Sequence, residues 1–255
     1  MADMMRLQTD YLSIPARTLV PLLGGLSSRN AAVESARQRL LDWDFRLDPQ
    51  SVPAGIYAGW ERELGQLVAE RMVPANVRPH VGSPPLSRII DWMLSPPGEL
   101  GPDPLAARDS LVLAALDRAV ATLAEQFGID QSRWRYGQVE YKHVVLRHPL
   151  GRAVTDSLRE LFEVGPAPRG GNGSTVNQTG NGNLQTGGAS FRVIVDTRDW
   201  DASVGINTPG QSGNPQTPFY RNLFDLWAAD RYFPLAYTRA RVEAVVAERI
   251  WVRPR

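Results

Sequence analysis

The hydrophobic pattern of the chain changes near residue 130, and this change restricts the folds that are open to it. Before that point, apolar residues recur at steps of three and four, which is the spacing of a helix face. After Trp134 they recur at steps of two, which is the spacing of a strand face. We therefore predict an α+β fold, with a mainly helical section over residues 1–130 and a strand-rich section over residues 131–255. The two sections are expected to form one structural unit.

The helices of the first section carry clear start and stop signals. Asp103 and Pro104 are typical of an N-cap and a first helical position, and Gly128 is a typical stop. A second helix is predicted to begin at Ser51 and run to Met72. Further helices are expected over residues 30–43, 86–94 and much of the segment up to residue 23. The predicted core face of the helix before Gly128 consists of Val112, Leu116, Ala119, Leu123 and Phe127.

The second section alternates between apolar and polar residues in two places. Val139, Tyr141, His143 and Val145 would share one strand face, and Phe191, Val193 and Val195 would share another. Between them, residues 165–188 hold 8 of the chain's 22 glycines and four asparagines. Such a composition favours turns, so we expect this segment to bury little. A short helix is predicted over residues 219–229.

Composition excludes several classes of protein. Cysteine is absent, which rules out disulfides, thiolate catalysis and cysteine-bound metals. The net charge of +1 gives no field that would attract nucleic acid or an anionic membrane. No apolar run approaches the ~18 residues that a membrane span needs. Nucleic-acid and membrane partners are therefore not expected, and the N-terminus shows no signal peptide.

Spacing alone identifies no active site. Ser212 lies in a Gly/Asn/Pro-rich stretch typical of a turn, and this stretch does not fit the nucleophile elbow of α/β-hydrolases. The glycines of residues 170–175 lack the P-loop lysine, and those of 180–182 lack the third glycine of a dinucleotide fingerprint. Both glycine-rich stretches are interpreted as surface loop.

The three histidines do not converge in the sequence. His80 is far from the other two, and His143 and His148 would lie on opposite faces of a strand. We interpret His143 as a buried, hydrogen-bonded residue rather than a general base or metal ligand.

Arg192 and Asp196 lie four apart, on one predicted strand face. We interpret them as members of a partly buried charge network. A direct role in substrate binding is the alternative for this pair.

An ordered set of motifs resembles the penicillin acylase family of N-terminal-nucleophile hydrolases. Individually the motifs are weak, but they follow the family's order across most of the chain. Tyr136 and Asn172 replace the tryptophan and aspartate of the family's pattern. The motifs are residues 7–10, Trp43-Asp44, Tyr136-Gly137 through His143 to His148-Pro149-Leu150, residues 171–177, residues 189–196, and residues 207–215 followed by Tyr220, Leu226-Trp227 and residues 232–234.

The resemblance implies a mechanism and a fold. In this family a precursor cleaves itself, and a serine becomes the first residue of the large β chain. The α-amino group of that serine acts as general base, and N–H donors stabilise the oxyanion. The fold is a four-layer αββα sandwich, of which this chain would supply the C-terminal strands and a largely helical section. The substrate would be an N-acyl amide, either a β-lactam side chain or an acyl-homoserine lactone.

The chain departs from the family at the residues that carry out the chemistry. Residue 1 is Met, Ala2 has no nucleophilic atom, and no Ser-Asn pair occurs anywhere. We therefore assign no catalytic, cofactor-binding or metal-binding residue to this chain, and expect the nucleophile, the oxyanion asparagine and the calcium ligands to lie upstream. The implied partners are the α subunit and the N-terminal part of the β subunit.

Two other functions stay open. The chain could be a stand-alone, non-catalytic binding or interaction domain that uses its Gly/Asn-rich loop, or a hydrolase with an unrecognised site. The resemblance implies a periplasmic or secreted location and leaves the particular acyl amide undetermined.

Overall fold

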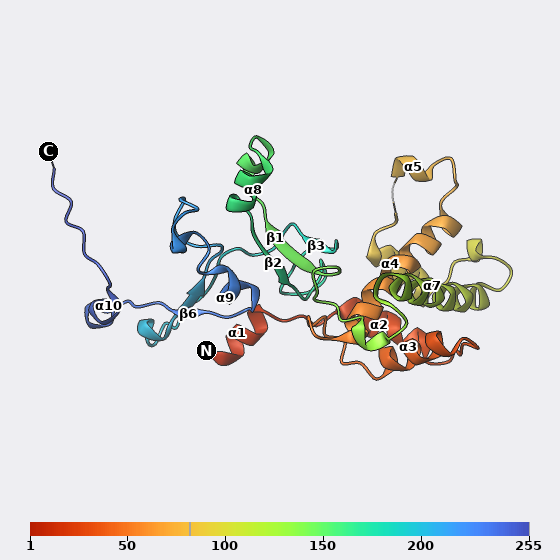
Figure 1. Ribbon diagram of the computed structural model, residues 1–255. Helices are drawn as coiled ribbons and strands as arrows, with labels where there is room; N and C mark the ends of the chain where they lie inside the picture. Colours follow the sequence, from red (N-terminus) through yellow and green to blue (C-terminus); the bar gives the residue numbers. More distant parts are fainter. Residues whose placement is uncertain (82, 255) are drawn as a thin grey trace.

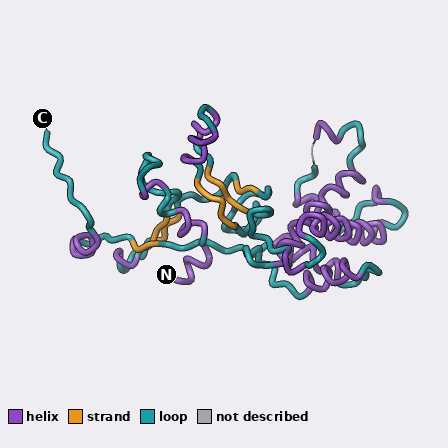
Figure 2. The backbone as a smooth tube through the Cα atoms, in the orientation of Figure 1, coloured by secondary structure: helices purple, strands orange, loops and turns teal. Residues whose placement is uncertain are grey.

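A computed structural model describes residues 1–81 and 83–254 (Figure 1). Most helices of the first half gather in one lobe at the right of Figure 1, and the strands lie beside it (Figure 2). The expected α+β composition, with a helical first half followed by small sheets, is confirmed. The helical elements of the lobe are α2 (Ile14–Leu19), η1 (Val20–Leu23), α3 (Ala31–Leu41), α4 (Val52–Met72), α5 (Arg78–Val81), α6 (Leu86–Leu94), η2 (Gly98–Leu100) and α7 (Pro104–Phe127).

The predicted start signals act as helix caps. The side chain of Ser51 accepts a hydrogen bond from Ala54 N at 3.2 Å at the start of α4, and Asp103 accepts one from Ala106 N at 3.0 Å at the start of α7. Asn30 caps α3 in the same way. Pro15 interrupts no helix, because it lies in the first turn of α2, where a proline leaves no internal hydrogen bond unmade.

The helices α4 and α7 pack against each other along the centre of the lobe. The predicted core face of α7 is buried in full, as is the indole of Trp60 on α4. Trp60 Nε1 donates to the carbonyl oxygen of Val112 at 2.9 Å, so the buried indole leaves no unpaired donor. Tyr141, from the start of the second half, also joins this core and donates to the carbonyl oxygen of Gly55 at 2.8 Å.

The first sheet has the order β2-β1-β3. Strand β1 (His143–Leu146) pairs antiparallel with β2 (Val164–Pro168) and parallel with β3 (Leu184–Gln185). The predicted strand face was wrong. The strand begins only at His143, Val139 is exposed, and Val144 is the β1 residue that is buried in the core. A run of turns over residues 137–142 breaks the alternation before the strand starts.

The second sheet has the order β4-β5-β6 and is antiparallel. It consists of β4 (Arg192–Ile194), β5 (Val204–Ile206) and β6 (Phe233–Pro234). Phe191 and Val195, predicted to share a strand face with Val193, lie just outside β4 and are 59% and 50% exposed, and Arg192 is the buried residue of the strand. A second, smaller hydrophobic cluster of Val144, Val164, Ile206, Tyr220, Phe224 and Trp227 lies between the two sheets and α9 (Phe224–Ala228).

The helix predicted over residues 219–229 is shorter than expected. A 3₁₀ turn, η6 (Pro218–Tyr220), precedes α9, and only Phe224–Ala228 are α-helical. Four further helices were not predicted as such: α1 (Ala2–Gln8) as a separate element, α5, α8 (Asp156–Phe162) and α10 (Arg239–Val245). Helix α1 lies next to the elements of the second half rather than within the helical lobe (Figure 1). Tyr232 donates to Gln8 Oε1 at 2.6 Å, which ties α1 to the segment before β6.

The chain exposes more surface than a compact monomer of its mass. Its accessible surface is 15084 Å². The usual scaling for a folded monomer of 28.2 kDa gives about 11,200 Å². The excess of accessible surface is comparable to the area that the subunits of a permanent complex bury against each other.

Candidate functional site

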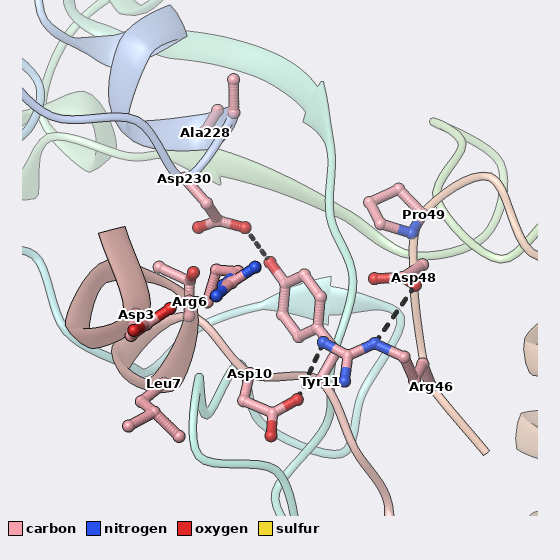
Figure 3. Close-up of a pocket in the computed structure, with 12 residues that line it drawn as sticks. Asp3, Arg6, Leu7, Asp10, Tyr11, Arg46, Asp48, Pro49, Ala228 and Asp230 are labelled. Atoms are coloured by element: carbon pink, nitrogen blue, oxygen red, sulfur yellow. Dashed lines mark hydrogen bonds and ion pairs between the residues drawn. The ribbon is translucent and has the colours of Figure 1, made fainter. Parts of the chain in front are cut away.

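The most developed polar site lies under a pocket of about 730 Å³ between α1, residues 46–49 and the end of α9 (Figure 3). Tyr11 points from the N-terminal segment toward Asp230, and their side chains form a hydrogen bond. Arg46 forms an ion pair with Asp10 at 2.9 Å on the opposite wall. Segments from both ends of the chain therefore meet at this pocket.

Asp230 is the centre of a hydrogen-bond network. Its Oδ1 accepts from Arg192 Nη1 at 2.8 Å, from Asn177 Nδ2 at 3.0 Å and from Arg169 Nη1 at 3.1 Å. Its Oδ2 accepts from Tyr11. The carboxylate thus receives four donors from three separate segments, which makes it the point at which these segments are held together.

Aromatic rings cover the two arginines. The Cζ atom of Arg169 lies 4.8 Å from the ring centroid of Trp227, and that of Arg192 lies 5.8 Å from the same ring and 5.5 Å from the ring of Tyr232. Both guanidinium groups are almost fully buried. Cation–π contacts therefore contribute to holding charge that water no longer solvates.

The local sequence explains how Asp230 reaches this position. Helix α9 ends in a Schellman motif, in which Asp230 N donates to the carbonyl oxygen of Trp227 and Arg231 N donates to that of Leu226. Asp230 adopts a left-handed backbone, with φ of 56°. Aspartate tolerates this conformation better than most residues, and the reversal turns its carboxylate back toward the helix and the arginines.

The network has the chemistry of an organising site rather than a reactive one. Two buried guanidinium groups face one carboxylate, and Arg192 Nε has no hydrogen-bond partner among the described residues. Burial raises the pKa of the Tyr11 phenol, and the neighbouring Asp230 carboxylate raises it further. A phenol that is harder to ionise is no nucleophile at neutral pH.

A second buried cation organises the Gly/Asn-rich segment. Lys142 Nζ donates to the carbonyl oxygens of Thr179, Gly180 and Gly182 at 3.1, 2.7 and 2.6 Å. Burial lowers the pKa of this ammonium group to about 8, and the charge of Arg169 acts in the same direction. Because all three donors are committed to the loop, Lys142 fixes the loop in place and is not free to attack a substrate.

The predicted pairing of Arg192 with Asp196 was wrong, although Arg192 does belong to a buried charge network. Its partner is Asp230, 38 positions away. Asp196 instead accepts hydrogen bonds from the backbone N–H groups of Arg198 and Asp199, at 2.9 and 3.1 Å. These bonds lower its pKa. Strand β4 ends at Ile194, so the two side chains do not share a strand face.

The prediction that the Gly/Asn-rich segment buries little holds only for part of it: residues 181, 182 and 186–188 are exposed, but much of the middle of the segment is not. Gly170, Gly171, Asn172, Thr175, Asn177 and Thr179 are buried. Gly171 has φ of +67°, and a Cβ atom there would come within 2.7 Å of both Asn177 O and the Tyr11 ring. The buried part of the segment packs against Tyr11, Leu47 and Pro49, and Gly170 and Gly171 allow that close approach.

The histidines and Ser212 form no constellation. His143 is half-buried rather than buried, and its Nδ1 lies 3.3 Å from the carbonyl oxygen of Tyr141. His148 caps the 3₁₀ turn η4 (Pro149–Arg152), and His80 is exposed. Ser212 Oγ accepts from Asn214 N at 3.1 Å, in the turn that its neighbours predicted. Within residues 1–81 and 83–254, no three His, Cys, Asp or Glu side chains are grouped so that they could hold a metal ion.

Sequence reasoning missed the residues that build both polar sites. Asp230 is separated from its arginine partners by at least 38 positions, and Lys142 from the carbonyl groups that it binds by at least 37. An aspartate just after a short helix is a weak sequence signal for a left-handed C-cap. It does not predict which arginine or lysine side chain will contact the carboxylate.

Comparisons with known proteins agree with the ordered motifs. The Penicillin amidase family matches residues 1–244. The penicillin acylase 2 proenzyme of Pseudomonas sp. (strain SE83) is 30% identical over 261 residues, covering 94% of this chain and 33% of that protein. The acyl-homoserine lactone acylase QuiP of Pseudomonas fluorescens (strain Pf0-1) is 28% identical, over 82% of this chain and 26% of its own length. The chain thus spans a third or less of these relatives, and it matches their C-terminal portion.

The fold is similar to that of a solved structure. Thermostable penicillin G acylase from Alcaligenes faecalis superimposes with a TM-score of 0.51 at 18% sequence identity. The match covers 96% of this chain and 48% of the other. None of the helices in the described part of the chain has the length and hydrophobicity to cross a membrane.

Proposed function

Because the chain belongs to the penicillin amidase family, we propose that it is the C-terminal part of the β chain of an enzyme that hydrolyses N-acyl amides. The nucleophile is an N-terminal serine contributed by a segment outside this chain. The chain supplies C-terminal strands of a four-layer αββα sandwich and a helical section packed beside them. Its partners are the α chain, the N-terminal part of the β chain and the acyl amide substrate.

The main support for this proposal is the share of the chain that aligns with known acylases. Nearly the whole chain aligns with one third of a penicillin acylase proenzyme. The exposed apolar side chains of Phe191 and Val195 and the large accessible surface support it, because both fit a body that packs against further protein. The polar sites support it as well: they hold segments in place and contain no activated nucleophile.

The charge network has a structural role in this proposal. It joins the N-terminal segment, the Gly/Asn-rich segment, β4 and the end of α9 at one carboxylate. These segments contain three of the motifs shared with the family. The network therefore holds the C-terminal sheet in the geometry that the catalytic part of the enzyme requires.

The substrate is either the acyl side chain amide of a β-lactam or an acyl-homoserine lactone. The names of the relatives include both activities. A stand-alone binding domain is the alternative function. The Lys142-anchored state of the Gly/Asn-rich segment disfavours it, because the carbonyl groups of Thr179, Gly180 and Gly182, which such a domain could offer to a ligand, are already bonded to Lys142.

A chimeric proenzyme tests the proposal. In the chimera, this chain replaces the matched C-terminal region of the Pseudomonas penicillin acylase 2 proenzyme. We expect the chimera to cleave itself into two chains and to hydrolyse chromogenic phenylacetyl or long-chain acyl amides. The matched control carries alanine in place of the nucleophilic serine and should do neither. A chimera that folds but neither matures nor hydrolyses any acyl amide would contradict the proposal.

A further inference from the structure

A separate pocket of about 450 Å³ lies between α4 and the Gly/Asn-rich segment. Volumes of roughly 300–1,000 Å³ are usual for small-molecule sites. Helix α4 contributes Glu61 and Arg62 to its lining, and the Gly/Asn-rich segment contributes Asn172, Asn181 and Asn183. The Asp230 network uses none of these five side chains, so the pocket is a second polar site with no role assigned so far.

Glu61 supplies a carboxylate that is held in place and has too few donors. Tyr57 is fully buried, and its hydroxyl group forms a hydrogen bond with Glu61 Oε2. Glu61 Oε1 accepts no hydrogen bond from any other residue in the described chain. Burial raises the pKa of this carboxyl group, because water solvates its charged form poorly there. A ligand that donates to Oε1 would replace solvation that the carboxylate lacks.

Asn172 supplies a buried donor. The residue is only 5% exposed, and its Oδ1 accepts from Ser174 N at 2.8 Å. A backbone N–H can donate only to the oxygen of a side-chain amide, so this bond fixes which way the amide is turned. The Nδ2 group donates to no residue in the described chain, although the side chain lines the pocket. Buried amide groups are normally hydrogen-bonded, so the occupant of the pocket is expected to accept from Nδ2.

Asn181 supplies a second donor, which is fixed before any ligand binds. Its Oδ1 accepts from Gly173 N at 2.8 Å, which leaves Nδ2 as the group that can donate. Lys142 Nζ donates to the carbonyl oxygens of Gly180 and Gly182, the residues on either side of Asn181. Because the backbone is already held, less conformational entropy is lost when a ligand binds to this side chain.

The balance of donors, acceptors and charge indicates the class of ligand. Amide donors beside a carboxylate acceptor require a ligand whose groups both accept and donate, and a hydroxyl group does both. Arg62 offsets the charge of Glu61, so the lining has no net charge that would favour a small anion or cation. Ala58, Leu86 and Tyr136 complete the lining with apolar surface, against which the C–H groups of a sugar ring can pack.

We propose that this pocket binds a neutral, hydroxyl-rich ligand of the saccharide class. Hydroxyl groups of the sugar donate to Glu61 Oε1 and accept from the Nδ2 groups of Asn172 and Asn181. The site takes no part in amide hydrolysis, so the inference goes beyond the proposed function and does not depend on it.

Titration of the full chain with D-glucose, D-galactose and D-mannose tests the site. We expect at least one of these sugars to shift the side-chain amide NMR signals of Asn172 and Asn181 in a saturable way. Saturation-transfer difference NMR on that sugar then gives its dissociation constant. The constant should rise at least tenfold in each of Asn172→Asp, Asn181→Asp and Glu61→Gln, because each variant removes one hydrogen bond to the ligand.

The variants are chosen so that loss of folding cannot be mistaken for loss of binding. The two aspartate variants keep the oxygen that accepts the backbone N–H and lose only the Nδ2 donor. Asn181 is exposed, so its variant tests the site even if Asn172→Asp lowers the stability of the chain. Asn214→Asp is the matched control. Asn214 Oδ1 also accepts from the backbone N–H two positions on, but the residue is exposed and lies outside the pocket, so binding should not change.

Three results would overturn the inference. The first is the absence of a saturable shift with all three sugars. The second is a dissociation constant that is the same in Asn172→Asp and Asn181→Asp as in the parent chain, which would place the sugar elsewhere. The third is tighter binding of D-glucosamine, D-glucuronate or N-acetylglycinamide than of every neutral sugar, which would indicate a cation, anion or peptide site. Sugar binding by a chain whose chimera is inactive supports the pocket and counts only against the proposed function.

Discussion

Arg192 Nη1 lies 2.8 Å from Asp230 Oδ1, although 38 positions separate the two residues in the sequence. The ion pair joins the first strand of the second sheet to the end of α9, and both side chains are largely removed from water. A buried charge that loses its partner is strongly destabilising, whereas a surface pair contributes little. The stability of the C-terminal section should therefore depend on this pair.

Asp230→Ala is expected to lower the free energy of unfolding by ~3–5 kcal/mol, because it leaves two buried guanidinium groups without their carboxylate. Arg192→Ala should cost less, because Asp230 keeps Arg169 as a charged partner. Chemical denaturation of the single variants and of the double variant measures the coupling between them. The double variant should cost clearly less than the sum of the single ones. Asp196→Ala removes only hydrogen bonds within an exposed turn and should cost clearly less than Asp230→Ala. Coupling of Arg192 to Asp196 rather than to Asp230 would contradict the network described above.

The sequence predicted the helices far better than the polar sites, for a physical reason. Capping by Ser51 and Asp103 is local, since the cap and the amide that it satisfies are three residues apart. The hydrophobic periodicity of α7 is local in the same sense. Asp230, Arg169 and Lys142 contact their partners only after the chain has folded. The sequence alone is compatible with many other pairings of its charged residues.

The strands were predicted less well because their alternation is interrupted. Turns displace the start of β1 to His143, and β4 buries Arg192 while Phe191 and Val195 beside the strand stay exposed. Periodicity assigns the apolar face of a strand to the core. That rule fails where no other element of this chain packs on the apolar face. The boundary near residue 130 and the upstream positions of the nucleophile and the calcium ligands remain predictions.

Two glycines of the Gly/Asn-rich segment form a matched pair for testing its packing. Gly171 and Gly180 both have positive φ, at +67° and +74°, but only Gly171 is crowded; nothing lies within 4 Å of a Cβ atom at Gly180. Gly180→Ala should cost ~1–2 kcal/mol from backbone strain alone. Gly171→Ala should cost a further ~1–3 kcal/mol from overpacking against Tyr11 and Asn177. Equal losses in thermal and urea unfolding would show that the segment is a loose surface loop.

The stability of α3 should depend on pH through Glu34. Hydrogen bonds from the Arg37 side chain, and then from Gln38 and the Ser28 backbone, lower the pKa of Glu34 from 4.5 to about 2. Because the pKa is lower in the folded state, the contribution of Glu34 is complete above about pH 4.5 and is lost as the pH falls toward 2. The stability difference between the parent chain and Glu34→Gln should therefore narrow between pH 5 and pH 3 in urea titrations. A difference that stays constant over this range would rule out the assigned ion pair.

The exposed apolar surface should make the isolated chain bind a hydrophobic dye. Phe191, Val195 and Trp251 are each at least half exposed, and the total accessible surface exceeds that of a compact monomer. We expect strong enhancement of dye fluorescence and concentration-dependent association in light scattering. A monodisperse monomer that melts sharply without binding dye would favour the stand-alone binding domain.

Amide hydrolysis by the isolated chain compared with the chimera is the most direct test of the account. The isolated chain should give no turnover of phenylacetyl or long-chain acyl amides above the buffer rate, because it contributes no nucleophile, and loss of a covalent route costs several orders of magnitude in rate. The chimera should hydrolyse at least one of these amides, and the serine-to-alanine control should not. Turnover that copurifies with the isolated chain and disappears on substituting one of its own residues would contradict the account, because the catalytic site would then lie within these 255 residues.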